Sequence, residues 1–153
     1  MNSVSHDPAG TRRHWLAVLA RAPVERLAAA LDGEDGLPAF RTVKPAQTGL
    51  VMVRGRAGGT GERFNLGEMT VSRCTVADAA GRIGVGWVAG RDRRKAELIA
   101  RADALLQDPV RYQRLKTTLI EPLALEIAAA NAARAAKAAA TKVDFFTMVR
   151  GDD

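Results

Sequence analysis

The residues best suited to chemistry lie between Thr48 and Cys74, where glycines and arginines are interleaved. Glycine tolerates positive φ angles, so successive backbone N–H groups can converge on an anion. Arginine adds a planar fork of donors that fits phosphate-like oxygens. The pattern indicates an anion-binding loop or, alternatively, a flexible hairpin loop whose arginines face water. The candidate anion-binding or interface residues here are Arg54, Gly55, Arg56, Gly58, Gly59, Gly61, Arg63 and Glu68.

This segment does not match the common nucleotide-binding motifs. A P-loop requires Gly-Lys-Ser or Gly-Lys-Thr after four spacer residues, and a dinucleotide fingerprint requires a small residue where Phe64 stands. A second basic run, from Arg91 to Lys95, begins a predicted helix whose free N–H groups would suit a phosphate. The alternative is a solvated basic first turn capped by Asp92. Arg91 and Arg93 are therefore further candidates.

The remaining reactive residue types do not form a recognisable catalytic set. The single cysteine, Cys74, follows Arg73 but lies among strand residues, which favours a small buried apolar group over a nucleophile. The two histidines have no carboxylate cluster at metal-ligand spacing, so no metal site is expected. Glu68 has arginine neighbours in a predicted strand, which favours an ion pair over acid–base catalysis.

The end of the sequence, ATKVDFFTMVRGDD, is unusually apolar for a terminus. Such a run must be buried, either on the domain's own sheet or in a groove of a partner. The candidate docking residues are Phe145, Phe146, Met148 and Arg150.

Length and composition indicate one folded domain with an anionic partner. The 153 residues suit a single domain over 11–153, preceded by a frayed leader at 1–10. The net charge of +6 favours contact with nucleic acid, nucleotide or an acidic partner, although only 5% aromatic residues weaken the nucleic-acid interpretation. One cysteine, no signal peptide and no apolar run of membrane-spanning length predict a cytoplasmic protein.

Hydrophobic periodicity predicts an α+β fold with an N-terminal helical hairpin, an antiparallel sheet of about three or four strands, and long C-terminal helices. Asp92 and Asp108 are predicted helix N-caps, and Pro122 is expected to kink or interrupt the last helix. The predicted helices are 11–22, 23–32, 92–107, 108–123 and the alanine-rich 124–140; the predicted strands are 40–43 (in a loop at 33–48), 50–53, 69–76 and 83–89.

TGLVMVRGRAGGTGERFNLGEMTVSRC at 48–74 and ATKVDFFTMVRGDD at 140–153 strongly resemble the G-subunit family of the bacterial carbon–phosphorus lyase system for phosphonate breakdown. RHWLAVLARA, GRDRRKAELIARADALLQ and the alanine-rich helix follow in the family's order, so the resemblance covers nearly everything after residue 10. The motif blocks show no departure from the family's pattern.

The resemblance implies a subunit of a two-fold core complex with H, I and J subunits, in contact most directly with I. In that complex the I subunit, supported by G and H and by an ATPase-like L subunit, displaces adenine from ATP with a phosphonate to form ribose 1-phosphonate 5-triphosphate. ATP and phosphonate are then substrates of the complex, and this chain carries no cofactor and no assigned catalytic residue. A nucleic-acid-binding module and a free-standing enzyme using Cys74 or Glu68 are the rival hypotheses, and a homodimer of the isolated chain is left open.

Overall fold

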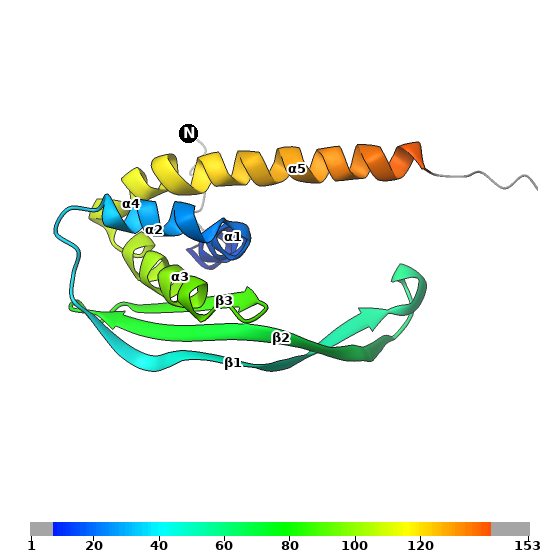
Figure 1. Cartoon of the computed structure of the whole chain (residues 1–153), viewed down its shortest axis with the longest axis horizontal. Helices are drawn as coiled ribbons and strands as arrows, with labels where there is room; N and C mark the ends of the chain where they lie inside the picture. The colour runs from blue at the N-terminus through cyan, green and yellow to red at the C-terminus, as the bar shows by residue number, and fades with distance from the viewer. Residues whose placement is uncertain (1–7, 142–153) are drawn as a thin grey trace, which may run out of the picture.

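Helices cover one face of a three-stranded antiparallel sheet (Figure 1). The computed structural model describes residues 8–141. The predicted α+β class, N-terminal helical hairpin and long C-terminal helix are confirmed. The elements, in chain order, are α1 (Pro8–Arg21), α2 (Val24–Asp32), β1 (Phe40–Arg56), the 3-10 turn η1 (Ala57–Gly59), β2 (Arg63–Asp78), β3 (Ile83–Ala89), α3 (Arg93–Leu106), α4 (Pro109–Leu115), the π-helical segment η2 (Lys116–Ile120) and α5 (Glu121–Ala140).

The first two strands are much longer than the sequence indicates. β1 has 17 residues and joins the predicted edge strand at 40–43 to the predicted strand at 50–53. Register shifts between Thr42 and Lys44 and between Lys44 and Gln47 accommodate Pro45. Because the sheet order is β1-β2-β3, β1 is an edge strand, where a proline without an N–H is tolerated. The predicted edge strand at 40–43 is therefore confirmed, whereas the predicted loop is wrong over 44–48, where β1 continues.

Two glycines let α3 lie directly on β3. A Cβ atom on Gly84 would stand 1.9 Å from the Ala100 carbonyl oxygen, and one on Gly86 would stand 1.8 Å from that of Ala96. The facing helix positions are alanines that are fully buried. This close backbone contact fixes α3 on the sheet, and α1, α2 and α4 pack around it.

A buried carboxylate joins α1, α3 and β3. Asp103 has no exposed surface and accepts hydrogen bonds from Arg12 Nε at 3.1 Å and from Trp15 Nε1 at 2.8 Å. It also accepts from the Val85 backbone N–H at 2.8 Å. Every donor around this carboxylate comes from another element, so the group connects three parts of the fold.

The helical region from Pro109 to Ala140 changes pitch over Lys116–Ile120, just before Pro122. Proline has no N–H for the carbonyl one turn earlier and its ring crowds that turn. The π-helical segment η2 lies in this turn and places Pro122 in the first turn of α5. Pro122 therefore interrupts the regular α-helix, as predicted. No helix among residues 8–141 is both long and apolar enough to cross a membrane.

The turn after β2 is held by Asp78, which is buried. Its Oδ1 accepts from the backbone N–H groups of Ala80 and Arg82, at 2.9 and 2.8 Å. Its Oδ2 pairs with Arg82 Nε at 2.7 Å. Burial acts to raise the pKa of Asp78, but the hydrogen bonds and charge of Arg82, with the Ala80 bond, outweigh burial and lower it.

Acid should therefore destabilise the fold partly through Asp78. A carboxyl with a lowered folded pKa contributes stability that is complete above its ordinary pKa, 3.8, and is lost as pH falls through the folded pKa. We expect the urea midpoint to fall more steeply below about pH 4 in the wild type than in Asp78→Asn. Urea unfolding at a series of pH values measures this difference, and equal slopes would contradict it.

Candidate functional site

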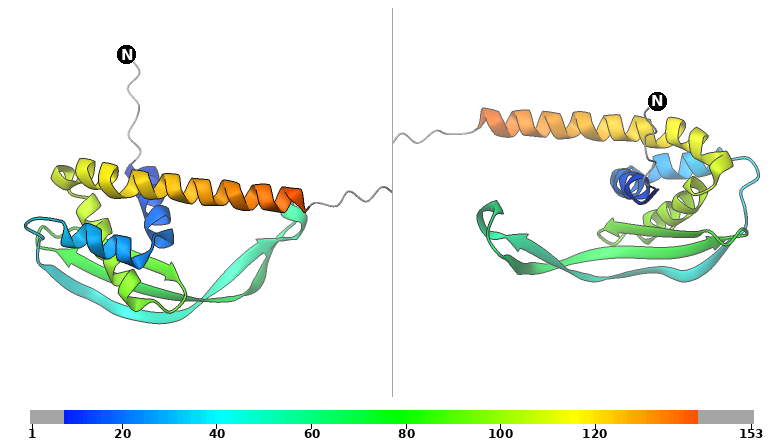
Figure 2. Two further views of the ribbon diagram at one scale, coloured as in Figure 1. Left: turned by 45° about the horizontal axis from the view of Figure 1, so that its top comes forward. Right: turned by 180° about the vertical axis from the view of Figure 1, so that it is seen from behind.

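The Thr48–Cys74 segment forms a long hairpin that extends beyond α1, α2 and α3 (Figure 1). Within residues 8–141, β3 pairs with Val71–Ala77 of β2, and residues 50–56 and 63–70 pair only with each other. This hairpin arm (residues 50–70) and α5 project in the same direction, and the tip of the arm bends toward the side on which α5 lies (Figures 1 and 2). A two-stranded hairpin is marginally stable alone in water. The arm thus receives little support from the core of the domain.

Large apolar side chains are exposed on both faces of the hairpin arm. Leu50 is 62% exposed and Met52 is 52% exposed, both on the face of the sheet that carries α3. Met69 is exposed on the opposite face, beside Val51. Toward the tip, Leu66 is 66% exposed. Large exposed apolar groups that gather on one part of a surface are typical of protein–protein contact sites.

The arginines of the predicted anion site lie at the outer end of the arm. Arg56 and Arg63 are cross-strand partners, so two like charges stand directly opposite each other. Such a pair destabilises a hairpin unless an anion or a carboxylate compensates it. Among the residues that the structure describes, the Arg56 side chain donates one long hydrogen bond, 3.4 Å, to the Gly61 carbonyl, and Arg54 is opposite Asn65. The tip therefore offers exposed cationic donors to an acidic group.

Glu68 does not form the ion pair that its arginine neighbours suggested. Its cross-strand partner is Met52, and within residues 8–141 no basic side chain is paired with it. The register decides this outcome, because it places Met52 and not an arginine opposite Glu68. Glu68 is exposed and free to contact a partner.

The glycines do not form one continuous anion-binding nest. Gly55 lies in β1 opposite Phe64, whose ring covers it, so its backbone belongs to the strand ladder. Gly58 and Gly59 take positive φ angles in the turn, at 58° and 80°. Gly61 is required there because a Cβ would stand 2.8 Å from the Ala57 carbonyl oxygen. Any backbone nest is thus limited to the tip of the arm.

Arg91 and Arg93 lie at the base of the arm, away from its tip. Arg93 Nε donates to Thr48 Oγ1 at 3.4 Å, and Asp92 caps α3 by accepting from the Lys95 backbone N–H. From Thr48 to Arg54 the strand advances about 20 Å at about 3.3 Å per residue. The two predicted basic clusters therefore form separate surfaces and not one anion site.

Comparison with known proteins identifies the family of this chain. The family model described as phosphonate metabolism protein PhnG matches residues 10–151. The chain belongs to the PhnG family. A relative from Rhizobium meliloti (strain 1021), named alpha-D-ribose 1-methylphosphonate 5-triphosphate synthase subunit PhnG, is 45% identical over 149 residues. The match covers 96% of this chain and 95% of the relative.

Cys74 is a core residue in this PhnG family member, as predicted. Its side chain is 2% exposed, and Sγ approaches the Lys44 carbonyl oxygen at 3.5 Å. Burial, followed by the charge of Glu97, raises the pKa of the Cys74 thiol. A protonated, buried thiol is a poor nucleophile. No metal-binding group of three or more His, Cys, Asp or Glu side chains forms among the residues that the structure describes.

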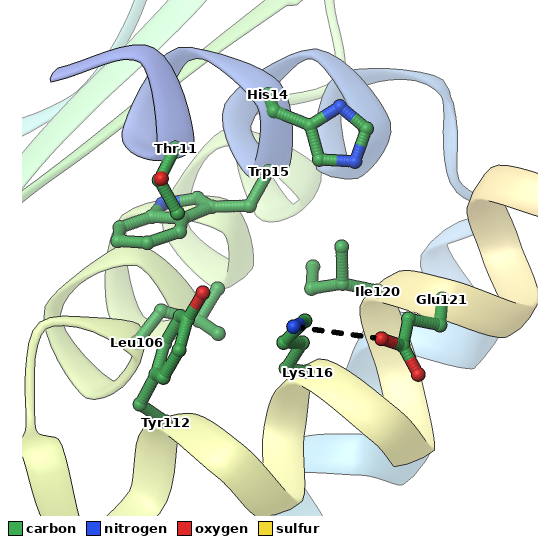
Figure 3. A pocket seen from close by; sticks show the side chains of 8 residues that line it. All are labelled: Thr11, His14, Trp15, Leu106, Tyr112, Lys116, Ile120 and Glu121. Carbon is green, nitrogen blue, oxygen red and sulfur yellow. Dashed lines mark ion pairs between the residues drawn. The ribbon is translucent and has the colours of Figure 1, made fainter. Parts of the chain in front are cut away.

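A pocket of about 490 Å³ lies between α1 and the α4–α5 region (Figure 3). Trp15 and Tyr112 form part of its wall, with ring centroids 5.9 Å apart. Its polar groups are largely engaged, because Lys116 pairs with Glu121 at 3.7 Å and the Trp15 N–H is donated to Asp103. The pocket of this PhnG family member therefore offers a mainly apolar surface with one neutralised ion pair.

A second pocket, of about 500 Å³, was not predicted from the sequence. This basic pocket lies between α1, β3, α3 and α5, and its cations are Arg21, Lys95 and Arg134. They come from three helices that are far apart in the sequence. Only Lys95 belongs to a run that sequence reasoning selected. One pattern in the sequence could have indicated part of this pocket. The α5 residues that line it recur at helical spacing and therefore share one face of the helix: Leu123, Glu126, Ile127, Ala130, Asn131 and Arg134.

The predicted docking segment of this PhnG family member lies outside the described residues. Phe145, Phe146, Met148 and Arg150 lie outside the described residues, as does His6. Their docking role stays a prediction. The described surface with the strongest features of an interface is the hairpin arm.

Proposed function

We propose that this chain is a non-catalytic subunit of a cytoplasmic assembly that converts ATP and a phosphonate into ribose 1-phosphonate 5-triphosphate with release of adenine. In this proposal the assembly is the carbon–phosphorus lyase core complex. The name of the Rhizobium meliloti relative, a synthase subunit, supports the reaction. The observation that carries the proposal is the hairpin arm, a two-stranded extension with apolar groups exposed on both faces.

The accessory role agrees with the structural contacts of the buried titratable side chains. Asp103 and Asp78 are buried and hold structural hydrogen bonds, and Cys74 is a buried thiol. Glu34 is buried and pairs with Arg111 and Arg114. These groups stabilise the domain instead of facing a substrate. The chemistry is then assigned to another subunit, which this chain shapes or stabilises.

The proposed partners are the H, I and J subunits, with I in direct contact. The hairpin arm would lie in a groove of I, where apolar side chains on both faces become buried and acidic groups meet Arg54, Arg56 and Arg63. The C-terminal residues Phe145, Phe146, Met148 and Arg150 are proposed as a second docking segment. Without partners, two copies would cover their arms by forming a homodimer.

The test is co-expression with candidate H, I and J subunits, followed by size-exclusion chromatography and an assay of adenine release from ATP with methylphosphonate. We expect the chain to co-elute with the complex and adenine release to depend on it. The variant Leu50→Asp/Leu66→Asp should keep the far-UV spectrum and thermal midpoint of the wild type, because both side chains are exposed. It should lose co-elution and at least about tenfold of the adenine release, because buried carboxylates cannot be solvated in an interface.

Val110→Asp is the matched control, because Val110 is 88% exposed on α4 and lies outside the arm. It should assemble and support adenine release as the wild type does. Deletion of residues 143–153 tests the second docking segment in the same assay. Full assembly of the Leu50→Asp/Leu66→Asp variant would refute docking through the arm, and elution of the wild-type chain alone would refute the subunit assignment.

A further inference from the structure

The basic pocket combines a small-molecule volume with a cationic wall. Its volume of about 500 Å³ falls within the range of small-molecule sites. Its inner surface contains the buried side chains of Ala22, Val88 and Leu123. Arg21 extends from the last turn of α1, Lys95 from the first turn of α3, and Arg134 from α5. α1 and α5 contact each other, so their positions around the pocket are fixed by the fold.

The cations of this pocket are not neutralised by the carboxylate that shares it. Glu126 also lines the pocket, but its Oε1 accepts from Arg26 at 3.0 Å. Within the described residues, no ion pair forms between a carboxylate and Arg21, Lys95 or Arg134. Asp92 and Glu25 act on Lys95 through their charge, and neither lines the pocket. The wall thus keeps three donors for an anion.

The amine of Lys95 is partly buried in the wall of the basic pocket. Burial lowers the pKa of its amine, and the charges of Asp92 and Glu25 only partly oppose this. A bound anion would favour the charged amine and offset the desolvation. The pocket also provides the side-chain amide of Asn131, a neutral donor, on the same face of α5 as Arg134.

We infer that the basic pocket binds a small molecule that carries a chain of phosphoryl groups. Three cations on three separate helices match several linked anionic groups better than one, because each cation can contact a different group. The choice of a triphosphate rests on the proposed function, since the relative is named for a 5-triphosphate product. The charge pattern alone supports a polyanion. An acidic peptide of a partner is the competing occupant, and the test separates the two.

The experiment titrates the full-length chain with inorganic triphosphate by isothermal calorimetry, with inorganic phosphate as a second probe. We expect triphosphate to bind and phosphate to bind at least about tenfold more weakly. Arg134→Ala and Lys95→Met should each weaken triphosphate binding about tenfold. Arg134 is exposed on α5, so its loss should not affect folding. Arg13→Ala is the matched control: it removes the same charge from an exposed position on α1 outside the pocket, and should change binding less than about twofold.

Several outcomes would overturn the inference. If triphosphate did not bind, the pocket would not be an anion site. If Arg13→Ala weakened triphosphate binding as much as Arg134→Ala, the binding would come from the general positive charge of the surface and not from the pocket. Loss of assembly in Arg134→Ala with unchanged triphosphate binding would assign the pocket to a partner's acidic peptide. The same variants, co-expressed with H, I and J subunits, keep this inference distinct from the proposed function. If the wild-type chain assembles with the H, I and J subunits but does not bind triphosphate, only the inference about the pocket is contradicted. If it binds triphosphate but never assembles, only the subunit assignment is contradicted.

Discussion

Replacing Gly86 by alanine is expected to prevent normal folding of the domain or to destabilise it by more than about 3 kcal/mol. The added Cβ would stand 1.8 Å from the Ala96 carbonyl oxygen and 2.8 Å from the Ala100 nitrogen. Both are backbone atoms of α3, so no side-chain rotation relieves the overlap. The helix would have to move away from β3, and the core between them would lose contact. Urea unfolding followed by far-UV circular dichroism measures the loss.

Gly49→Ala is the matched control for this substitution. Gly49 also lies in a strand, but a Cβ there has no atom within 4 Å and its φ angle is not positive. Alanine should leave stability unchanged or raise it by up to about 1 kcal/mol. If Gly86→Ala unfolded at the same urea concentration as Gly49→Ala, the close approach of α3 to the sheet would be wrong.

Replacing Asp103 by alanine should cost about 3–5 kcal/mol of stability. The carboxylate is fully buried and receives donors from Arg12, Trp15 and Val85. Its removal leaves the Trp15 N–H and the Val85 N–H without an acceptor in the interior, and each such group costs about 1–3 kcal/mol. Asp103→Asn keeps the shape and one acceptor oxygen, so its loss should be smaller. Urea midpoints of both variants test this order.

Glu97→Gln provides the comparison for a surface ion pair. Glu97 pairs with Arg101 one turn away on α3, and both side chains are more than 40% exposed. Exposed pairs of this spacing contribute about 0.3–0.5 kcal/mol, so this variant should differ little from the wild type. Equal losses in Asp103→Ala and Glu97→Gln would show that the buried network contributes no more than a surface pair.

The sequence predicted the features that depend on local interactions. Asp92 and Asp108 accept from nearby backbone N–H groups as N-caps, because a cap requires only a short polar side chain at the start of a periodic segment. The burial of Cys74 follows from a similarly local pattern, a single cysteine among strand residues. The helices begin and end near their predicted positions, although some boundaries differ. The first helix, for example, begins at Pro8 and not at residue 11.

The features that depend on distant parts of the chain were missed. Pairing with β2 carries β1 through Pro45 and through the glycines that indicated a loop. The exposed Leu66 and the paired Arg56 and Arg63 become meaningful only when the register is known. The basic pocket requires the packing of α1 against both α3 and α5, which no local spacing specifies.

The hairpin arm also affects how a cell must produce this chain. Under the proposed docking, a newly made copy displays its apolar strand residues to chaperones and proteases until a partner covers them. β1 is at the same time an edge strand whose outer hydrogen-bonding groups are available for pairing with another chain. Copies made in excess of their partners are therefore exposed to aggregation and degradation, which links the steady amount of this chain to the supply of the subunits that receive it.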